Sequence, residues 1–421
     1  MPPALCFLTE IPDAAWESLL PQLIKNKVAG AVALCCKLLR NQVQRGTKEL
    51  CLSFGTNTAA AGLDTLPEHF PGCKKLRITV KQLEQIAVLS ALPVLARLPT
   101  LSEVVLCLPR HDPGQQEARA ASNMPLGPGI CNALAQLTGL QLLQVLRCSI
   151  TLPRSTVLTA LKQLKGVHLN GWSPSMLPLL AQCTQLTRLC GEWVAAAAET
   201  GRPADVAITE CPSVIALHGS GPIPFAAFKR VQRMTQWEPW QPAVFSSIAQ
   251  HCRQLRNLDF HMGHAVWGTR FPASMPADAP AERRMAAIRS LAGLQQLQLL
   301  DFAVNDSAEV AALAAITQLQ QLRLRVPTSS SCSIAGIMHV VALRQLKFLT
   351  LELYGLPFVA STEAESLLVA LQGVPCVEIL CIAGTTLRAG FRAAVAALRA
   401  ASLLAPADVK IREHKYRVAQ V

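Results

Sequence analysis

The chain has 421 residues, of which 51% are hydrophobic, and 39 Lys and Arg against 27 Asp and Glu give it a formal net charge of +12. This composition provides enough apolar side chains for a folded core and excludes a chain that is disordered throughout. Aromatic residues make up only 5%, which favours many small leucine-lined cores, as in repeat proteins, over one large aromatic core.

The sequence offers no candidate for a membrane span. Such a helix needs about 20 predominantly apolar residues, and the longest uncharged apolar stretch, residues 86–96, is about half that length and contains Pro93. The N-terminus lacks a basic region ahead of an apolar run and so does not resemble a secretory signal. We therefore expect a soluble protein without a membrane partner, located in the cytoplasm, with the nucleus or the cytoskeleton and axoneme as alternatives.

Residues 1–46 carry apolar residues at helical spacing and predict two or three short helices, which must pack on something to be stable. Ile11-Pro12-Asp13 and LCCKLLRNQV at residues 34–43 resemble the start and the core of a divergent F-box, with Leu where that domain usually has Trp. The resemblance implies that this segment binds the adaptor subunit of a cullin-type ubiquitin ligase. The residues that it implies for contact or packing are Ile11, Pro12, Leu19, Leu20, Leu23 and Val28. The alternative is that the helices only cover the end of the following domain.

A repeated string, x-x-L-x-x-L-x-L with Cys or Leu three residues before its first Leu, organises residues 47–400. The successive first Leu or Val residues are 22 to 41 residues apart, mostly in or near the period of leucine-rich repeats. They are Leu76, Leu101, Leu140, Leu164, Leu186, Val214, Leu255, Leu294, Leu319, Leu346 and Val377. This stretch resembles the leucine-rich repeat family, and the leading Cys73, Cys183, Cys211 and Cys252 resemble its cysteine-containing subclass, common in F-box proteins.

The resemblance implies an α/β leucine-rich repeat solenoid, with a curved parallel sheet on the concave side and short helices on the convex side. The hydrophobic period agrees, because the L-x-L alternation predicts short strands and the apolar residues between them are spaced three and four apart, as in helices. Ser307 and Ser333 stand where helix N-caps are expected.

Three spacings between repeats are too long, and their extra residues have a loop composition. These segments, residues 110–129, 229–244 and 261–284, are candidate partner sites, because inserted loops often carry contacts. Residues 401–421 follow an amphipathic helix and predict a C-terminal cap with a basic tail, which either closes the solenoid or makes an electrostatic contact.

The strand alternation predicts which side chains line the concave surface, because residues between the buried Leu positions point the other way. We predict a mixed polar, partner-binding face that includes Arg147, His168, Arg188, His218, Asp259, His261, Arg323, Arg325, Phe348 and Glu352. Its histidines and aspartate are possible metal ligands, but a solvated polar face explains them better, since strands two apart are too far for a shared ion. Its arginines could bind phosphate or an acidic peptide, or serve only solubility.

No nucleotide-binding, zinc-protease or serine-hydrolase motif occurs in the sequence. We therefore expect no enzyme, no cofactor and no metal, and without a dense Lys/Arg run interleaved with aromatic residues we do not expect a nucleic-acid partner. The first hypothesis is a substrate-recognition subunit of a ubiquitin ligase, with an adaptor and a target protein as partners and a monomeric chain outside that complex. The alternative is a structural or scaffolding leucine-rich repeat protein, cytoskeletal or axonemal; an enzyme with an unrecognised site is the residual third possibility.

Overall fold

The computed structural model describes residues 47–54, 66–80, 89, 92–107, 128–149, 157–170, 172, 174–193, 209–236, 242–260, 280–327, 330–354, 361–382, 385–400 and 408–413. The F-box-like segment 1–46 and its six predicted contact residues lie outside this part of the chain. The chain divides into two compact units, Met1–Val206 and Ala207–Val421.

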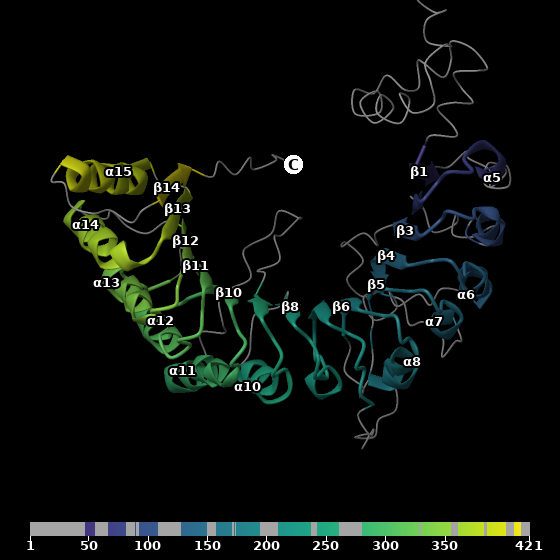
Figure 1. Cartoon of the computed structure of the whole chain (residues 1–421), viewed down its shortest axis with the longest axis horizontal. Coiled ribbons are helices and arrows are strands. Elements are labelled where there is room, and N and C mark those ends of the chain that lie inside the picture. Colours follow the sequence, from purple (N-terminus) through teal and green to yellow (C-terminus); the bar gives the residue numbers. More distant parts are fainter. Residues whose placement is uncertain are drawn as a thin grey trace, which may run out of the picture. The chain divides into compact units, whose positions relative to one another are not determined.

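The described part of the first unit consists of parallel strands that pair in chain order, with helices between them (Figure 1). Helices α6 to α8 lie on one side of its strands. The strands are β1 (Glu49–Phe54), β2 (Lys75–Val80), β3 (Glu103–Cys107), β4 (Leu142–Ser149), β5 (Gly166–Asn170) and β6 (Arg188–Glu192). The helices are α5 (Leu66–His69), α6 (Pro128–Ala135), α7 (Val157–Ala160), η5 (Pro174–Met176) and α8 (Leu177–Gln182).

The second unit repeats this arrangement, and helices α10 to α15 lie on one side of its strands (Figure 1). The strands are β7 (Ala216–Ser220), β8 (Arg233–Gln236), β9 (Asn257–Asp259), β10 (Leu299–Ala303), β11 (Gln321–Val326), β12 (Phe348–Tyr354), β13 (Cys376–Ile382) and β14 (Asp408–Glu413). The helices are η6 (Phe225–Ala227), α10 (Pro242–His251), α11 (Ala281–Ser290), η7 (Leu291–Gly293), α12 (Ser307–Leu313), α13 (Ile334–Ile337), η8 (Met338–Ala342), α14 (Ser361–Ala370), η9 (Leu371–Gly373) and α15 (Thr385–Ala400).

The leucines of the repeat form the core because they occupy the same register in neighbouring strands. Leu322 of β11 lies opposite Leu349 of β12, and Leu324 lies opposite Leu351; all four are buried. Burying such side chains between a sheet and a helix layer removes apolar surface from water, which is the main favourable term in folding. The α/β leucine-rich repeat solenoid predicted from the sequence is thereby confirmed.

The cysteines that lead four of the repeats are part of the same cores. Cys73, Cys183, Cys211 and Cys252 are all buried. Burial raises the pKa of the Cys252 thiol to about 12, so this thiol stays protonated at neutral pH. Protonated, buried thiols behave as small hydrophobic side chains.

The structure contains more strands of the repeat than the sequence pattern predicted. Residues 229–244, interpreted as a loop, contain strand β8 and the start of α10, and Met234 of β8 occupies the core position that Leu258 occupies in β9. The loop interpretation failed because Val231 and Met234 replace the expected leucines. The sheet also continues beyond residue 400, since β14 pairs in parallel with β13.

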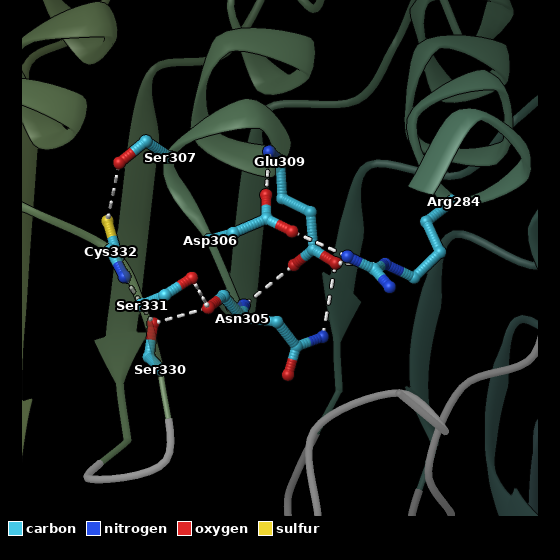
Figure 2. Close-up of polar contacts among 8 residues, drawn as sticks. All are labelled: Arg284, Asn305, Asp306, Ser307, Glu309, Ser330, Ser331 and Cys332. Atoms are coloured by element: carbon cyan, nitrogen blue, oxygen red, sulfur yellow. Dashed lines mark hydrogen bonds and ion pairs between the residues drawn. The ribbon is translucent and has the colours of Figure 1, made fainter. Parts of the chain in front are cut away.

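A buried polar network on the helix side joins α11 to the start of α12 (Figure 2). The Glu309 carboxylate is 0% exposed, accepts hydrogen bonds from the backbone and side-chain amides of Asn305 at 2.8 and 3.1 Å, and accepts one from Arg284 Nε at 2.8 Å. Asp306 caps α12 by accepting from the Glu309 N–H at 2.9 Å, and its other oxygen lies 2.5 Å from Arg284 Nη2. The predicted cap Ser307 is therefore wrong by one residue, because the carboxylate of Asp306 reaches the free N–H.

The carbonyl of Asn305 also anchors the next repeat (Figure 2). It accepts hydrogen bonds from the backbone N–H of Ser331 at 2.7 Å and from the Ser330 hydroxyl at 2.9 Å. Two residues later, Ser333 caps α13 by accepting from the Gly336 N–H at 3.0 Å, as predicted. These bonds fix the turn that follows β11 and hold neighbouring repeats in register.

Candidate functional site

One row of side chains runs across the strand face of the second unit opposite the leucine core. Its members occupy the same register position from β7 to β14, so each lies beside the next across one strand spacing, about 4.8 Å. The row is His218, Thr235, Asp259, Asp301, Arg323, Thr350, Glu378 and Lys410. The polar, alternating face predicted from the sequence is thus continuous in this unit.

A cluster of five charged residues lies in the middle of this face, and we call Asp259, Asp301, Arg323, Arg325 and Glu352 the central charge cluster. Arg325 is its centre: Nη2 lies 2.5 Å from Asp301 Oδ2 and 4.0 Å from Asp259 Oδ1, and Nε lies 3.4 Å from Glu352 Oε2. Its Nη1 also donates to a backbone carbonyl, that of Phe260, at 3.3 Å. Arg325 is only 5% exposed, so its guanidinium is occupied by groups of the same chain.

Arg323 belongs to the same cluster but reaches the surface. Its Nε donates to Glu352 Oε1 at 2.8 Å, and its Nη1 lies 3.7 Å from Asp301 Oδ2. Glu352 also accepts a hydrogen bond from the Tyr354 hydroxyl at 2.9 Å. The side chain of Arg323 is 45% exposed, so its guanidinium is held by Glu352 and Asp301 and is still accessible to solvent.

Phe348 is the apolar counterpart of Arg323 on this face. It lies opposite Gln321, two residues before Arg323 along β11, and is 50% exposed. Among the large exposed hydrophobic side chains of the described residues, Phe348 is the aromatic one. Phe348 and Arg323 are therefore exposed residues of this face whose types are enriched at the energetic centres of interfaces.

The Asp301 carboxyl is the group of the central charge cluster whose pKa differs most from its ordinary value. Burial, together with the negative charges of Asp259 and Glu352, raises its pKa to about 7, against the lowering effect of Arg325 and Arg323. Within the described residues, Asp301 Oδ1 is buried and makes no hydrogen bond. A protonated Asp301 is therefore favoured in the folded protein over most of the acidic range.

This raised pKa predicts a pH dependence of stability. Between the ordinary Asp pKa of 3.8 and about 7, the folded state binds more protons at Asp301 than the unfolded state does, so this group's contribution to stability falls as pH rises through that window and is constant above it. The Asp301→Asn variant, measured by urea unfolding at pH 5, 6, 7 and 8, should gain stability relative to the original protein as pH rises. A difference that stays constant with pH would contradict the assignment.

The structure places five of the predicted partner-binding residues in or beside the central charge cluster. They lie on strands β9, β11 and β12 of the second unit and are Asp259, Arg323, Arg325, Phe348 and Glu352. Their pairing partner on β10, Asp301, was not among the residues proposed for binding, although the strand alternation already assigned it to this face.

Four of the other predicted residues lie on described strands outside the central charge cluster. In the second unit, His218 Nδ1 is 2.9 Å from Thr235 Oγ1, and His261 lies outside the described residues. In the first unit, Arg147 belongs to β4, Arg188 is exposed at the start of β6, and His168 of β5 is half-buried, with a pKa lowered by that burial.

The described part of the chain meets neither the requirements of a metal site nor those of a membrane-spanning helix. In this part of the chain no group of three or more His, Cys, Asp and Glu side chains is arranged to hold a metal ion. None of the helices that the structure describes combines the length and the apolar character required to cross a bilayer.

A comparison with protein-family models gives no match, and a comparison with curated protein sequences gives none either. Among solved structures, the chain is similar to an internalin from Listeria monocytogenes at 15% identity and a TM-score of 0.42, covering 83% of this chain and 86% of that one. It is also similar to the leucine-rich repeat-containing protein LegL7 from Legionella pneumophila, at 12% identity, a TM-score of 0.38 and coverages of 79% and 90%. A structure of the yeast Rad7 and Elc1 complex matches at 13% identity, a TM-score of 0.34 and coverages of 89% and 85%. The chain's own strands, register and leucine cores make its described part an α/β leucine-rich repeat solenoid.

Proposed function

We propose that the chain is a protein-binding module that holds a partner against the strand face of its second unit, over the central charge cluster and Phe348. The observation that carries this proposal is the pairing of a half-exposed phenylalanine with a half-exposed, firmly held arginine on one open face. Aromatic residues and arginine are the side chains enriched at the energetic centres of protein interfaces.

The buried ion pairs support the proposal because they hold the face in one arrangement before a partner arrives. Glu352 fixes Arg323 through the 2.8 Å bond to Nε, and Arg325 fixes Glu352 and Asp301 from β11. A surface whose side chains are already immobilised loses less conformational entropy on binding. No bond-making step is needed for such a role.

We further propose that residues 1–46 connect this module to the adaptor subunit of a cullin-type ubiquitin ligase, as the F-box-like Ile11-Pro12-Asp13 and residues 34–43 suggest. In that role the chain would bring the target's lysines close to a conjugating enzyme and raise their effective concentration. A scaffolding protein of the cytoskeleton or axoneme, which needs no adaptor, is the alternative.

The binding proposal is tested by affinity purification and mass spectrometry with two matched variants. Phe348→Glu places a charge on the proposed contact face, whereas Val341→Glu places the same charge at an exposed apolar residue of η8, on the helix side. Proteins bound through the strand face should be lost with Phe348→Glu and retained with Val341→Glu. Equal retention by both variants would exclude this face as the binding site.

The ligase proposal is tested separately by pull-down of the adaptor. The full-length chain should retain the adaptor, and a chain that lacks residues 1–45 should not, while both still bind the target through the repeats. If the two chains behave alike toward the adaptor, the ligase role is wrong and the scaffolding alternative takes its place.

A further inference from the structure

The second unit carries exposed arginines besides that of the central charge cluster. Arg325 is buried, and Arg323, although partly exposed, is paired with Glu352. Four further exposed arginines lie at the edge of the sheet where strands β8 and β9 begin. We call Arg230, Arg233, Arg253 and Arg256 the basic edge patch.

The backbone bonds show that the two pairs of arginines are neighbours. The N–H of Arg256 donates to the carbonyl of Gln232 at 2.8 Å, and Arg233 is in register with Asn257, the residue after Arg256. Arg233 begins β8 and Arg256 directly precedes β9, so their backbones lie about one strand spacing, about 4.8 Å, apart at the same edge. Arg230 and Arg253 lie in the turns just before them, three residues earlier in each repeat.

None of these four arginines forms an ion pair with another residue that the structure describes. The neighbouring Lys229 shows the contrast, because its ammonium group pairs with Glu210. Like charges placed side by side repel one another and destabilise a fold. Four unneutralised guanidinium groups over two repeats therefore make a concentrated site for a negatively charged ligand.

The patch ends before the next repeat. Along the same row of backbone bonds, Arg256 is followed by the neutral Gln298 and Gln320, and the next basic residue of the row is Lys347, in the β12 repeat. A nucleic acid strand would need a positive track that continues along the sheet, with aromatic rings for its bases. A patch two repeats wide is better matched to a short row of carboxylates, which guanidinium groups bind through paired hydrogen bonds.

We infer that the basic edge patch binds an acidic segment, rich in Asp and Glu, of a protein partner. The inference rests on the proposed protein-binding role and specifies the partner's chemistry: Arg233 lies on the same face as the central charge cluster, so an acidic segment held at this edge is next to the proposed contact face. The positive net charge of the chain would also speed the approach of such a partner.

The test uses a ten-residue glutamate peptide with a fluorescent label as the probe, and the full-length protein, with binding measured by fluorescence anisotropy at low and physiological salt. The patch variant is Arg253→Glu with Arg256→Glu. The control is Arg344→Glu with Lys347→Glu, which makes the same formal charge change at the equivalent, exposed positions of the β12 repeat. The patch variant should lose at least about tenfold in affinity, as expected for two charge-assisted contacts, and the control less than about twofold.

Several results would overturn the inference. Equal losses in both variants would mean that the peptide responds only to net charge, and no measurable binding to the original protein would remove the site altogether. Tighter, patch-dependent binding of a ten-nucleotide oligothymidylate than of the peptide would assign the patch to nucleic acid. These outcomes are distinct from failure of the proposed function, because Phe348→Glu leaves the basic edge patch intact and tests the partner face alone.

Discussion

Replacing Arg325 by methionine is expected to lower the free energy of unfolding by about 3 to 5 kcal/mol, because it removes the cation between two buried carboxylates. Asp301 and Glu352 would lose their contacts at 2.5 and 3.4 Å with the guanidinium and would remain buried. Methionine fills most of the same volume, so the loss measures the electrostatic role of Arg325. Urea unfolding followed by circular dichroism at pH 8 provides the measurement.

Two companion variants identify the cause of that loss. Arg323→Met removes a guanidinium from the same strand, but one that is partly solvated, and should cost about 1 kcal/mol. Combining Arg325→Met with Asp301→Asn and Glu352→Gln should recover much of the stability, because no unpaired charge remains in the cluster. If Arg325→Met alone cost no more than Arg323→Met, the central charge cluster would not be the buried network described here.

The second large effect is expected from Leu322→Asp, which should destabilise the protein by about 4 kcal/mol or more, since it inserts a carboxylate without a partner into the leucine core. Leu322 is 2% exposed and lies opposite Leu349 in the register. The matched control is Gln321→Asp, the same substitution one residue earlier on the opposite face of β11, which should change stability by less than about 1 kcal/mol. Thermal unfolding of the two variants compares them directly, and similar midpoints would refute the strand register.

The alternation of buried and exposed side chains within single strands could be predicted from the sequence, because successive residues of a strand point to opposite faces. It correctly assigned Leu322 and Leu349 to the core and Arg323 to the opposite face. The solenoid followed from the same leucines, since their recurrence at similar spacing requires equivalent strands that stack on one another.

The ion pairs of the central charge cluster could not be predicted, because they depend on how separate repeats align. Arg325 lies opposite Ala303 in the register, yet its guanidinium reaches diagonally to Asp301. The alternation placed Arg325 on the open face, and only the three-strand arrangement with Asp301 and Glu352 explains why it is buried there. A search for opposite charges at equivalent positions of successive repeats is the one sequence signal that could have found this set.

Two local predictions from the sequence were wrong because other side chains take the place of the expected leucine and serine. The β8 repeat was interpreted as a loop because Val231 and Met234 stand in place of leucine, although both fill core positions. Ser307 was predicted as the N-cap of α12, whereas the preceding Asp306 is equally suited to cap a helix and accepts the N–H of Glu309. Pattern matching on leucine and serine alone therefore missed residues that perform the same physical task.

Hydroxyl-radical footprinting of β12, with mass spectrometry of the unmodified full-length protein, tests most directly whether stacked repeats bury one strand face and expose the other. The register and burial predict rapid oxidation of Phe348 and protection of Leu349, Leu351 and Leu353. Oxidation of Leu349 as fast as that of Phe348, or protection that recurs every three to four residues, would contradict the stacked-strand structure and with it the proposed binding face.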